Sequence, residues 1–203
     1  MTMTLICLGD SLTYGYEVRR SRVWPALAAE KSGARILNKG INGLMTSGML
    51  ACFARDVLEE KPDAVLLMGG ANDILAGLGP EEPLGNMAAM VERAENAGIA
   101  PLIGIPVPFC PPIREDWAAM ADFPSRTPVY EAFVDRLHTL ALERARAIVD
   151  FRSALAGYAR EAGVPSRSVY LDGIHLNEDG HRLFAETLAT VLRERFMQSR
   201  IQS

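Results

Sequence analysis

Two short segments far apart in the chain contain the residue types of a hydrolytic triad. Ser11 stands in the segment GDSL at residues 9–12, directly after a short apolar run. Asp172 and His175 stand three residues apart in the segment DGIH. At this spacing the carboxylate can accept a hydrogen bond from the imidazole Nδ1–H, which leaves Nε2 free to take a proton from a serine hydroxyl. The two segments therefore predict Ser11 as a nucleophile, His175 as its base and Asp172 as the group that orients the imidazole.

Two further segments contain candidate donors to an oxyanion. Residues 38–43 (NKGING) include Gly40 and Gly43, where the absence of a Cβ lets a backbone N–H approach a ligand closely. Residues 69–73 (GGAND) include Asn72, whose side-chain amide is a second candidate donor. Taken alone, each segment is also compatible with a plain glycine-rich turn or a helix cap. The occurrence of all four segments in one chain favours catalysis.

The elements that must position these segments alternate along the chain. Short apolar runs, typical of buried strands, lie at residues 4–8, 35–38, 63–68, 100–105 and 147–151. Longer segments, typical of helices, lie at residues 23–31, 47–59, 83–96, 129–145, 153–162 and 178–196. This alternation predicts an α/β fold with a parallel sheet. Functional residues gather at the carboxyl ends of the strands in such sheets, so the four segments are expected to meet there.

Some residues and regions are expected to have structural roles. Residues 106–126 contain five prolines and predict mainly loop, and residues 169–171 predict a short extended segment. Ser47 and Asn177 are expected to cap the helices that follow them. His181, in the first turn of the last helix, is expected to be structural rather than catalytic.

In their order and spacing, the four segments resemble the sequence blocks of the SGNH hydrolases, also called the GDSL esterase/lipase family. The resemblance covers nearly the whole chain. It implies a flavodoxin-like three-layer α/β/α sandwich with a five-stranded parallel sheet, in a single domain over residues 1–203. It also implies an oxyanion hole formed by the Ser11 N–H, the Gly43 N–H and the Asn72 side chain. Gly40 competes with Gly43 for the second position, and the distance from Ser11 favours Gly43.

The resemblance implies a serine esterase that hydrolyses small or lipid-like acyl esters through an acyl-enzyme, with no metal or organic cofactor. Alternatives are an arylesterase, a lysophospholipase, a carbohydrate acetylesterase or an acyl thioesterase. A non-catalytic ligand-binding protein is disfavoured because all three triad residues are present. The candidates for the wall of an acyl pocket are Tyr14, Tyr16, Ile74, Leu75, Val107, Phe109 and Trp117.

The composition of the chain limits which kinds of partner it is expected to bind. The formal net charge of −4 argues against a nucleic-acid binder, which usually has a basic face. Three cysteines at wide spacing argue against a disulfide framework, and Cys7, inside an apolar run, is expected in the core. The chain shows neither a signal-peptide pattern nor about 18 consecutive apolar residues, so we expect a cytoplasmic protein without stable membrane insertion. A small ester is the expected partner, and homo-oligomerisation is left open.

Overall fold

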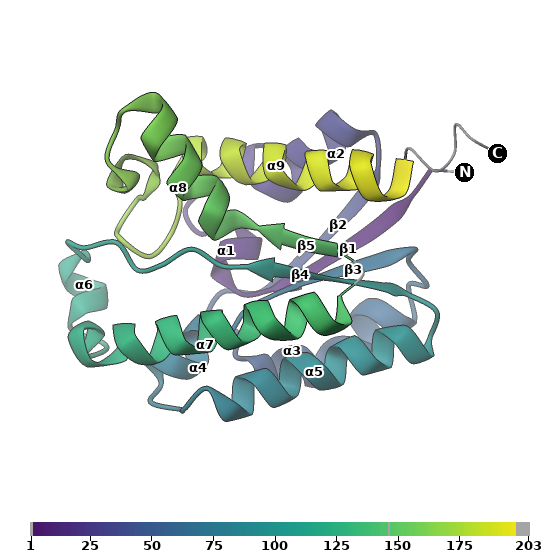
Figure 1. Cartoon of the computed structure of the whole chain (residues 1–203), viewed down its shortest axis with the longest axis horizontal. Helices are drawn as coiled ribbons and strands as arrows, with labels where there is room; N and C mark the ends of the chain where they lie inside the picture. The colour runs from purple at the N-terminus through teal and green to yellow at the C-terminus, as the bar shows by residue number, and fades with distance from the viewer. Residues whose placement is uncertain (1, 146, 198–203) are drawn as a thin grey trace.

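A five-stranded parallel sheet lies at the centre of the computed structural model, which describes residues 2–145 and 147–197 (Figure 1). Its strands are β1 (Thr4–Gly9), β2 (Arg35–Gly40), β3 (Ala64–Met68), β4 (Ala100–Ile105) and β5 (Ala147–Asp150). Their order in the sheet is β2-β1-β3-β4-β5, which is the flavodoxin-like order. The predicted fold class is therefore confirmed, and each strand lies where an apolar run predicted it.

Helices cover both faces of the sheet and complete the three layers (Figure 1). One face carries α2 (Trp24–Ser32), α8 (Phe151–Ala162) and α9 (Glu178–Leu192), and the other carries α3 (Thr46–Phe53), α5 (Glu81–Asn96) and α7 (Phe123–Arg144). Shorter helices are α1 (Ser11–Tyr14), α4 (Ala71–Leu75) and α6 (Glu115–Ala118), with 3₁₀ turns at Arg20–Arg22 and Ser166–Val169. No helix in the described part of the chain is long and apolar enough to cross a membrane.

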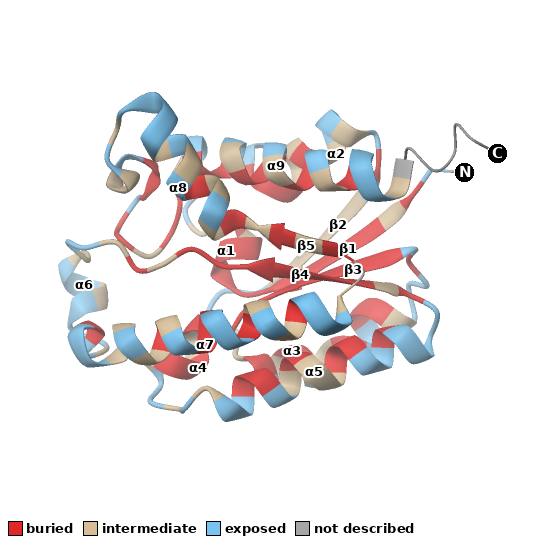
Figure 2. Ribbon diagram, in the orientation of Figure 1, coloured by how far each residue is buried: buried red, intermediate tan, exposed pale blue. Residues whose placement is uncertain are grey.

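Alternate side chains of the strands pack into two apolar cores, one on each face. The central strands are mostly buried, as are the sides of the helices that face them (Figure 2). In β1, Ile6 and Leu8 join the core under α3, α5 and α7, whereas Leu5 and Cys7 join the core under α2, α8 and α9. All four side chains are inaccessible to solvent, as expected for a parallel sheet covered on both faces. The prediction that Cys7 is a core residue is confirmed, and burial raises the pKa of its thiol.

The register of the sheet brings the ends of three strands level. Gly9, the last residue of β1, pairs with Gly40 of β2 and with Met68 of β3. The segments that follow these three residues therefore leave the same edge of the sheet side by side. They are the segments that contain the candidate nucleophile and the two candidate oxyanion donors.

The region between β4 and α7 is more helical than the sequence predicted. Residues 106–126 contain α6, and α7 begins at Phe123 rather than at Val129. Pro124 lies in the first turn of α7, where a missing N–H costs no intrahelical hydrogen bond. Asp122 caps the helix by accepting a hydrogen bond of 3.3 Å from the Ser125 N–H. The prediction of mainly loop is confirmed for residues 106–114 and 119–122, which include four of the five prolines, and is wrong at α6 and at the start of α7.

Three smaller predictions about helix ends met different outcomes. Asn177 caps α9 as predicted, and its Oδ1 accepts the N–H of Asp179 at 3.0 Å. Ser47 is not a cap, because α3 already begins at Thr46. The predicted extended segment 169–171 is confirmed only in part, because Val169 ends a 3₁₀ turn whereas Tyr170 is extended and forms an isolated antiparallel bridge with Leu176. The sequence predicted helices over 47–59 and 178–196. In the structure, α3 and α9 are each followed by a π-helical turn, at Ala54–Leu58 and Arg193–Met197 respectively.

Candidate active site

Ser11 is the first residue of α1 and lies at the carboxyl end of β1. Asp10 caps this helix, because its carboxylate accepts a hydrogen bond of 2.9 Å from the Leu12 N–H. A Cβ on Gly9 would lie 2.3 Å from the backbone oxygen of Met68, so the chain can turn into α1 this close to β3 only at a glycine. The tight turn holds Ser11 at the edge of the sheet, where 9% of its surface is exposed.

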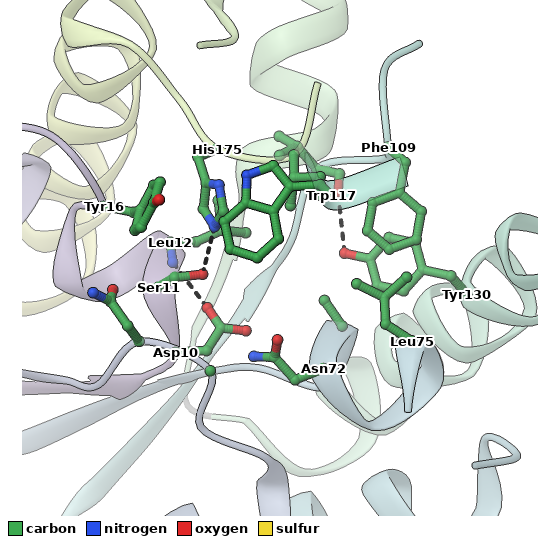
Figure 3. A pocket seen from close by; sticks show the side chains of 15 residues that line it. Asp10, Ser11, Leu12, Tyr16, Asn72, Leu75, Phe109, Trp117, Tyr130 and His175 are labelled. Carbon is green, nitrogen blue, oxygen red and sulfur yellow. Dashed lines mark hydrogen bonds between the residues drawn. The ribbon is translucent and has the colours of Figure 1, made fainter. Parts of the chain in front are cut away.

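His175 connects Ser11 to Asp172 by hydrogen bonds through both of its ring nitrogens. His175 Nε2 lies 2.9 Å from Ser11 Oγ (Figure 3), and His175 Nδ1 lies 2.7 Å from Asp172 Oδ2. Asp172 Oδ1 also accepts the backbone N–H groups of Ile174 at 2.9 Å and of His175 at 2.7 Å. The structure thus brings together the three residues that the sequence singled out.

Two opposing effects act on the Asp172 carboxyl group. Burial by itself raises its pKa, but the hydrogen bonds from the His175 ring and from two backbone N–H groups outweigh burial. The pKa of Asp172 is therefore held well below its ordinary value. The group stays an ionised acceptor at neutral pH, which favours the tautomer of His175 with its proton on Nδ1.

Two aromatic rings pack against His175 (Figure 3). The ring centroid of Tyr16 lies 4.4 Å from that of His175, and the centroid of Trp117, from α6, lies 5.4 Å away. Arg114, just before α6, forms an ion pair of 3.4 Å with Glu17 and so links α6 to the segment after α1. These contacts restrict the orientation of the imidazole and place aromatic surface over the serine.

The two candidate oxyanion donors line the same cavity as Ser11. Gly43 lies on the cavity wall with φ of 74°, a conformation that favours glycine. Gly40 does not line the cavity; a Cβ there would lie 2.2 Å from the Tyr14 nitrogen, so it is needed for packing against α1. Asn72 Nδ2 donates a hydrogen bond of 3.1 Å to the Leu44 carbonyl, which leaves its second N–H free. The geometry therefore favours Gly43 over Gly40.

A buried carboxylate that the sequence analysis missed supports this region. Asp73 is inaccessible to solvent and accepts hydrogen bonds from the Thr46 N–H at 3.0 Å and from the Thr46 hydroxyl at 2.5 Å. These bonds tie the start of α3, just after Gly43, to α4, which carries Asn72. The only sequence signal for this role was the position of Asp73 directly after Asn72.

The cavity beside Ser11 has a volume of about 90 Å³ and a largely apolar wall (Figure 3). The predicted acyl-pocket residues that line it are Tyr16, Leu75, Val107, Phe109 and Trp117. Tyr14 does not line this cavity, because its ring packs under the Arg20 guanidinium at 3.5 Å. Ile74 also points away and is buried in the core. The wall can therefore surround a small aliphatic group next to the serine.

Six further residues line the cavity that were not among the predicted wall residues: Asp10, Leu12, Asn42, Ala71, Tyr130 and Ile174. The Tyr130 hydroxyl donates a hydrogen bond of 3.0 Å to the Val107 carbonyl, so its polar atom is satisfied and its ring serves as apolar surface. The ring of Phe109 stacks on Tyr130 with centroids 4.5 Å apart. Tyr130 lies in the predicted helix 129–145, but a helix prediction does not reveal which cavity a side chain faces.

Two other ionisable groups near the site are buried. Burial raises the pKa of Asp10, which lines the cavity, to about 6. His181 is 1% exposed, and its Nδ1 accepts a hydrogen bond of 3.1 Å from the Trp24 N–H. Burial lowers the pKa of His181 to about 4, and the positive charge of His175 contributes in the same direction. His181 is therefore a structural residue, as expected.

Among the described residues, no group of three or more His, Cys, Asp or Glu could hold a metal ion.

Comparison with known proteins connects this site to a family. A sequence model of the GDSL-like lipase/acylhydrolase family matches residues 7–183, which include all the site residues above. The chain belongs to this family. It is therefore a hydrolase of ester bonds.

Named relatives and a solved structure agree with this assignment. The chain is 31% identical over 180 residues to esterase TesA of Pseudomonas aeruginosa, covering 85% of this chain and 79% of that protein. It is 32% identical over 102 residues to thioesterase 1/protease 1/lysophospholipase L1 of Escherichia coli, about half of each chain. A member of the lipolytic G-D-S-L family from Veillonella parvula superposes with a TM-score of 0.74 at 25% identity, covering 97% of this chain and 100% of that one.

Proposed function

We propose that this chain hydrolyses acyl esters through a covalent acyl-enzyme on Ser11, with His175 as general base and Asp172 as the carboxylate that orients it. The main support is the continuous hydrogen-bonded series from Ser11 Oγ through His175 to Asp172, at 2.9 Å and 2.7 Å. Family membership accounts for ester hydrolysis as a class, and this series identifies the groups in this chain that are placed to carry it out.

The reaction has two half-steps in this proposal. Ser11 Oγ attacks the ester carbonyl carbon while its proton passes to His175 Nε2. The bond to the alcohol oxygen then breaks, and His175 returns the proton to the departing alcohol. In the second half-step a water molecule attacks the acyl-enzyme, gives its proton to His175, and the acid leaves as Ser11 regains its hydrogen. Asp172 stays ionised throughout and stabilises the imidazolium.

The negative charge that develops on the carbonyl oxygen needs donors near Ser11. We assign this role to the Ser11 N–H, the Gly43 N–H and the free amide hydrogen of Asn72. Their positions on one cavity wall, held by the bonds of Asn72 to Leu44 and of Asp73 to Thr46, support the assignment. Such preorganised donors are worth about 3 kcal/mol each to the barrier, because they need no rearrangement when the charge forms.

The cavity wall supports an aliphatic acyl group as the recognised part of the substrate. Apolar side chains on α4, α6 and α7 surround much of the space next to Ser11, so a methylene chain would be buried there largely against apolar surface. A thioester carries the same acyl group, and one relative is named a thioesterase, so an acyl thioester is the second candidate substrate. The single domain, the cytoplasmic location and the absence of a nucleic-acid partner stay predictions.

The proposal is tested with p-nitrophenyl butanoate and a fluorophosphonate probe. Ser11→Ala should lower kcat by about 10⁴-fold or more and abolish covalent labelling by the probe. Ser47→Ala is a matched control, because Ser47 is exposed on α3 and lies outside the cavity. It should keep wild-type turnover, and mass spectrometry should locate the probe on Ser11. Labelling elsewhere, or turnover that survives in Ser11→Ala, would exclude Ser11 as the nucleophile.

A further inference from the structure

Phe109 forms a wall that two cavities share. One face of this wall borders the cavity beside Ser11, and the other borders a second hollow of about 290 Å³. The ring is held by stacking on Tyr130 at 4.5 Å and by an edge-on contact with Phe123, with centroids 5.2 Å apart. Phe109 is buried, and of the described residues it alone lines both the small cavity at the nucleophile and the larger one beyond it.

The second hollow is built for an apolar occupant. Its wall includes Ile113, Ala118, Ala121 and Phe123. Among the described residues that line it, Thr127 alone has a polar side chain, and its hydroxyl donates a hydrogen bond of 2.8 Å to the Phe123 carbonyl. The side chains of the wall therefore leave no unpaired donor or acceptor for a polar ligand, whereas a hydrocarbon chain would lose nothing by burial there.

The same two helices border both cavities, so the two spaces lie along these helices with Phe109 between them. The α6 helix contributes Trp117 to the first cavity and the next residue, Ala118, to the second. The first turns of α7 contribute Phe123 to the second cavity and Tyr130 to the first. A chain that starts at Ser11 and runs along these helices meets Phe109 and then the second hollow.

We propose that the second hollow is the distal part of the acyl site, and that Phe109 determines how long an acyl chain the enzyme accepts. A long unbranched acyl chain displaces the Phe109 ring and places its last methylenes between α6 and the start of α7. The substrates are then esters or thioesters of medium to long aliphatic acids rather than acetyl esters. This inference rests on the proposed function, because it extends the acyl site of the same serine.

The chain-length profile gives a quantitative expectation. Each methylene moved from water into an apolar site contributes about 0.8 kcal/mol, or about fourfold in kcat/KM. In the wild-type enzyme kcat/KM for p-nitrophenyl esters should continue to rise beyond butanoate, as far as dodecanoate. Phe109→Leu, which removes the ring but keeps an apolar side chain, should raise the ratio of dodecanoate to butanoate.

A side chain that fills the second hollow should remove the preference for long acyl chains. Ala118→Phe adds a ring at an exposed helical position that lines the second hollow, and Ala119→Phe adds the same ring at the adjacent exposed position, which lines neither cavity. Exclusion of three distal methylenes should lower the dodecanoate-to-butanoate ratio of kcat/KM by about 50-fold in Ala118→Phe. Ala119→Phe should keep the wild-type ratio. Equal ratios in the two variants would overturn the proposal.

A binding measurement separates this proposal from the catalytic one. Sodium dodecanoate and sodium butanoate are titrated into Ser11→Ala protein by calorimetry, with and without Ala118→Phe or Ala119→Phe. Ala118→Phe should weaken dodecanoate binding by about 50-fold, and Ala119→Phe should not. If no ester is hydrolysed but dodecanoate still binds more weakly to the Ala118→Phe protein than to the Ala119→Phe protein, the proposed function fails and the distal site stands. If esters are hydrolysed but neither measurement separates the variants, the distal site fails alone.

Discussion

Thr46, the first residue of α3, donates two hydrogen bonds to the buried carboxylate of Asp73 in α4, from its N–H at 3.0 Å and from its hydroxyl at 2.5 Å. Asn86 of α5 in turn donates to the Thr46 hydroxyl oxygen at 3.0 Å. The pair fixes the segment that contains Gly43 relative to the helix that carries Asn72. The positions of both proposed oxyanion donors therefore depend on a contact that touches neither of them.

Thr46→Val tests this dependence, because valine keeps the shape of threonine and removes the hydroxyl. The change removes the hydroxyl donor at 2.5 Å and leaves Asp73 Oδ1 only a shared, longer bond of 3.2 Å from the Thr46 N–H, which should lower the free energy of unfolding by about 1–3 kcal/mol. Looser oxyanion donors should lower kcat for p-nitrophenyl butanoate by about tenfold, with little change in KM. Thr187→Val is the control, because the Thr187 hydroxyl bonds within α9, to the Leu183 carbonyl. Wild-type kcat in Thr46→Val would refute the role of this contact.

Asn72→Ala should reduce kcat by about 10²–10³-fold and leave KM nearly unchanged, because the amide acts on the transition state rather than on the bound ester. Steady-state kinetics on p-nitrophenyl butanoate measure both quantities. Asn177→Ala removes another amide, which caps α9 and donates to the Ser168 carbonyl at 2.8 Å. That control should lose stability but keep kcat. A similar kcat loss in both variants would mean that Asn72 acts through the fold alone.

Most of the arrangement of the site was predictable because it depends on strand ends. Ser11, Gly43 and Asn72 each follow a predicted strand, and a parallel sheet places the ends of such strands at one edge. The spacing of Asp172 and His175 is local, so a single turn decides their contact. These features require only the alternation of strands and helices, which the apolar pattern of the chain contains.

The side chains that shape the acyl site were less predictable, because they depend on how α6 and α7 pack over the sheet. Tyr130 lies in the predicted helix 129–145, yet the direction in which its side chain points follows from how α7 packs over β4 and β5. Residues 106–126 were expected to be mainly loop, because prolines are usually read as helix breakers. Most of this region is loop as expected, but Pro124 lies in the first turn of α7, and Phe123 and Pro124 of this unpredicted helix start line the second hollow.

Asp172→Asn should lower kcat by about 10⁴-fold, because an amide N–H would face His175 Nδ1 and favour the tautomer with its proton on Nε2. That tautomer cannot accept the proton of Ser11. The asparagine oxygen can still accept the N–H groups of Ile174 and His175, so the turn should be kept. Asp150→Asn is the control, since Asp150 caps α8 by accepting the Ser153 N–H at 2.8 Å and lies outside the site. Stopped-flow kinetics with p-nitrophenyl butanoate measure the effect, and a loss below tenfold would exclude the orienting role.

His181 should make the fold sensitive to acid, in a way that His181→Asn removes. Burial lowers the pKa of His181 to about 4 from its ordinary value of 6.5, so between these values the unfolded chain binds a proton that the folded chain does not. Its contribution to stability is therefore complete above pH 6.5 and falls by about 3 kcal/mol as the pH is lowered to 4. In His181→Asn, the side-chain oxygen can accept the Trp24 N–H in place of Nδ1 and carries no titrating group.

The measurement is the free energy of unfolding in urea at several pH values from 7 to 4, for wild type and His181→Asn. The variant should be less stable at pH 7, because a smaller side chain leaves a cavity, but it should lose less stability on acidification. Asp10 and Asp172 titrate in both proteins, so their effects cancel in the difference between the two curves. His138→Asn controls for the loss of a histidine as such. Parallel curves for His181→Asn and wild type would show that His181 is not the group that couples this fold to pH.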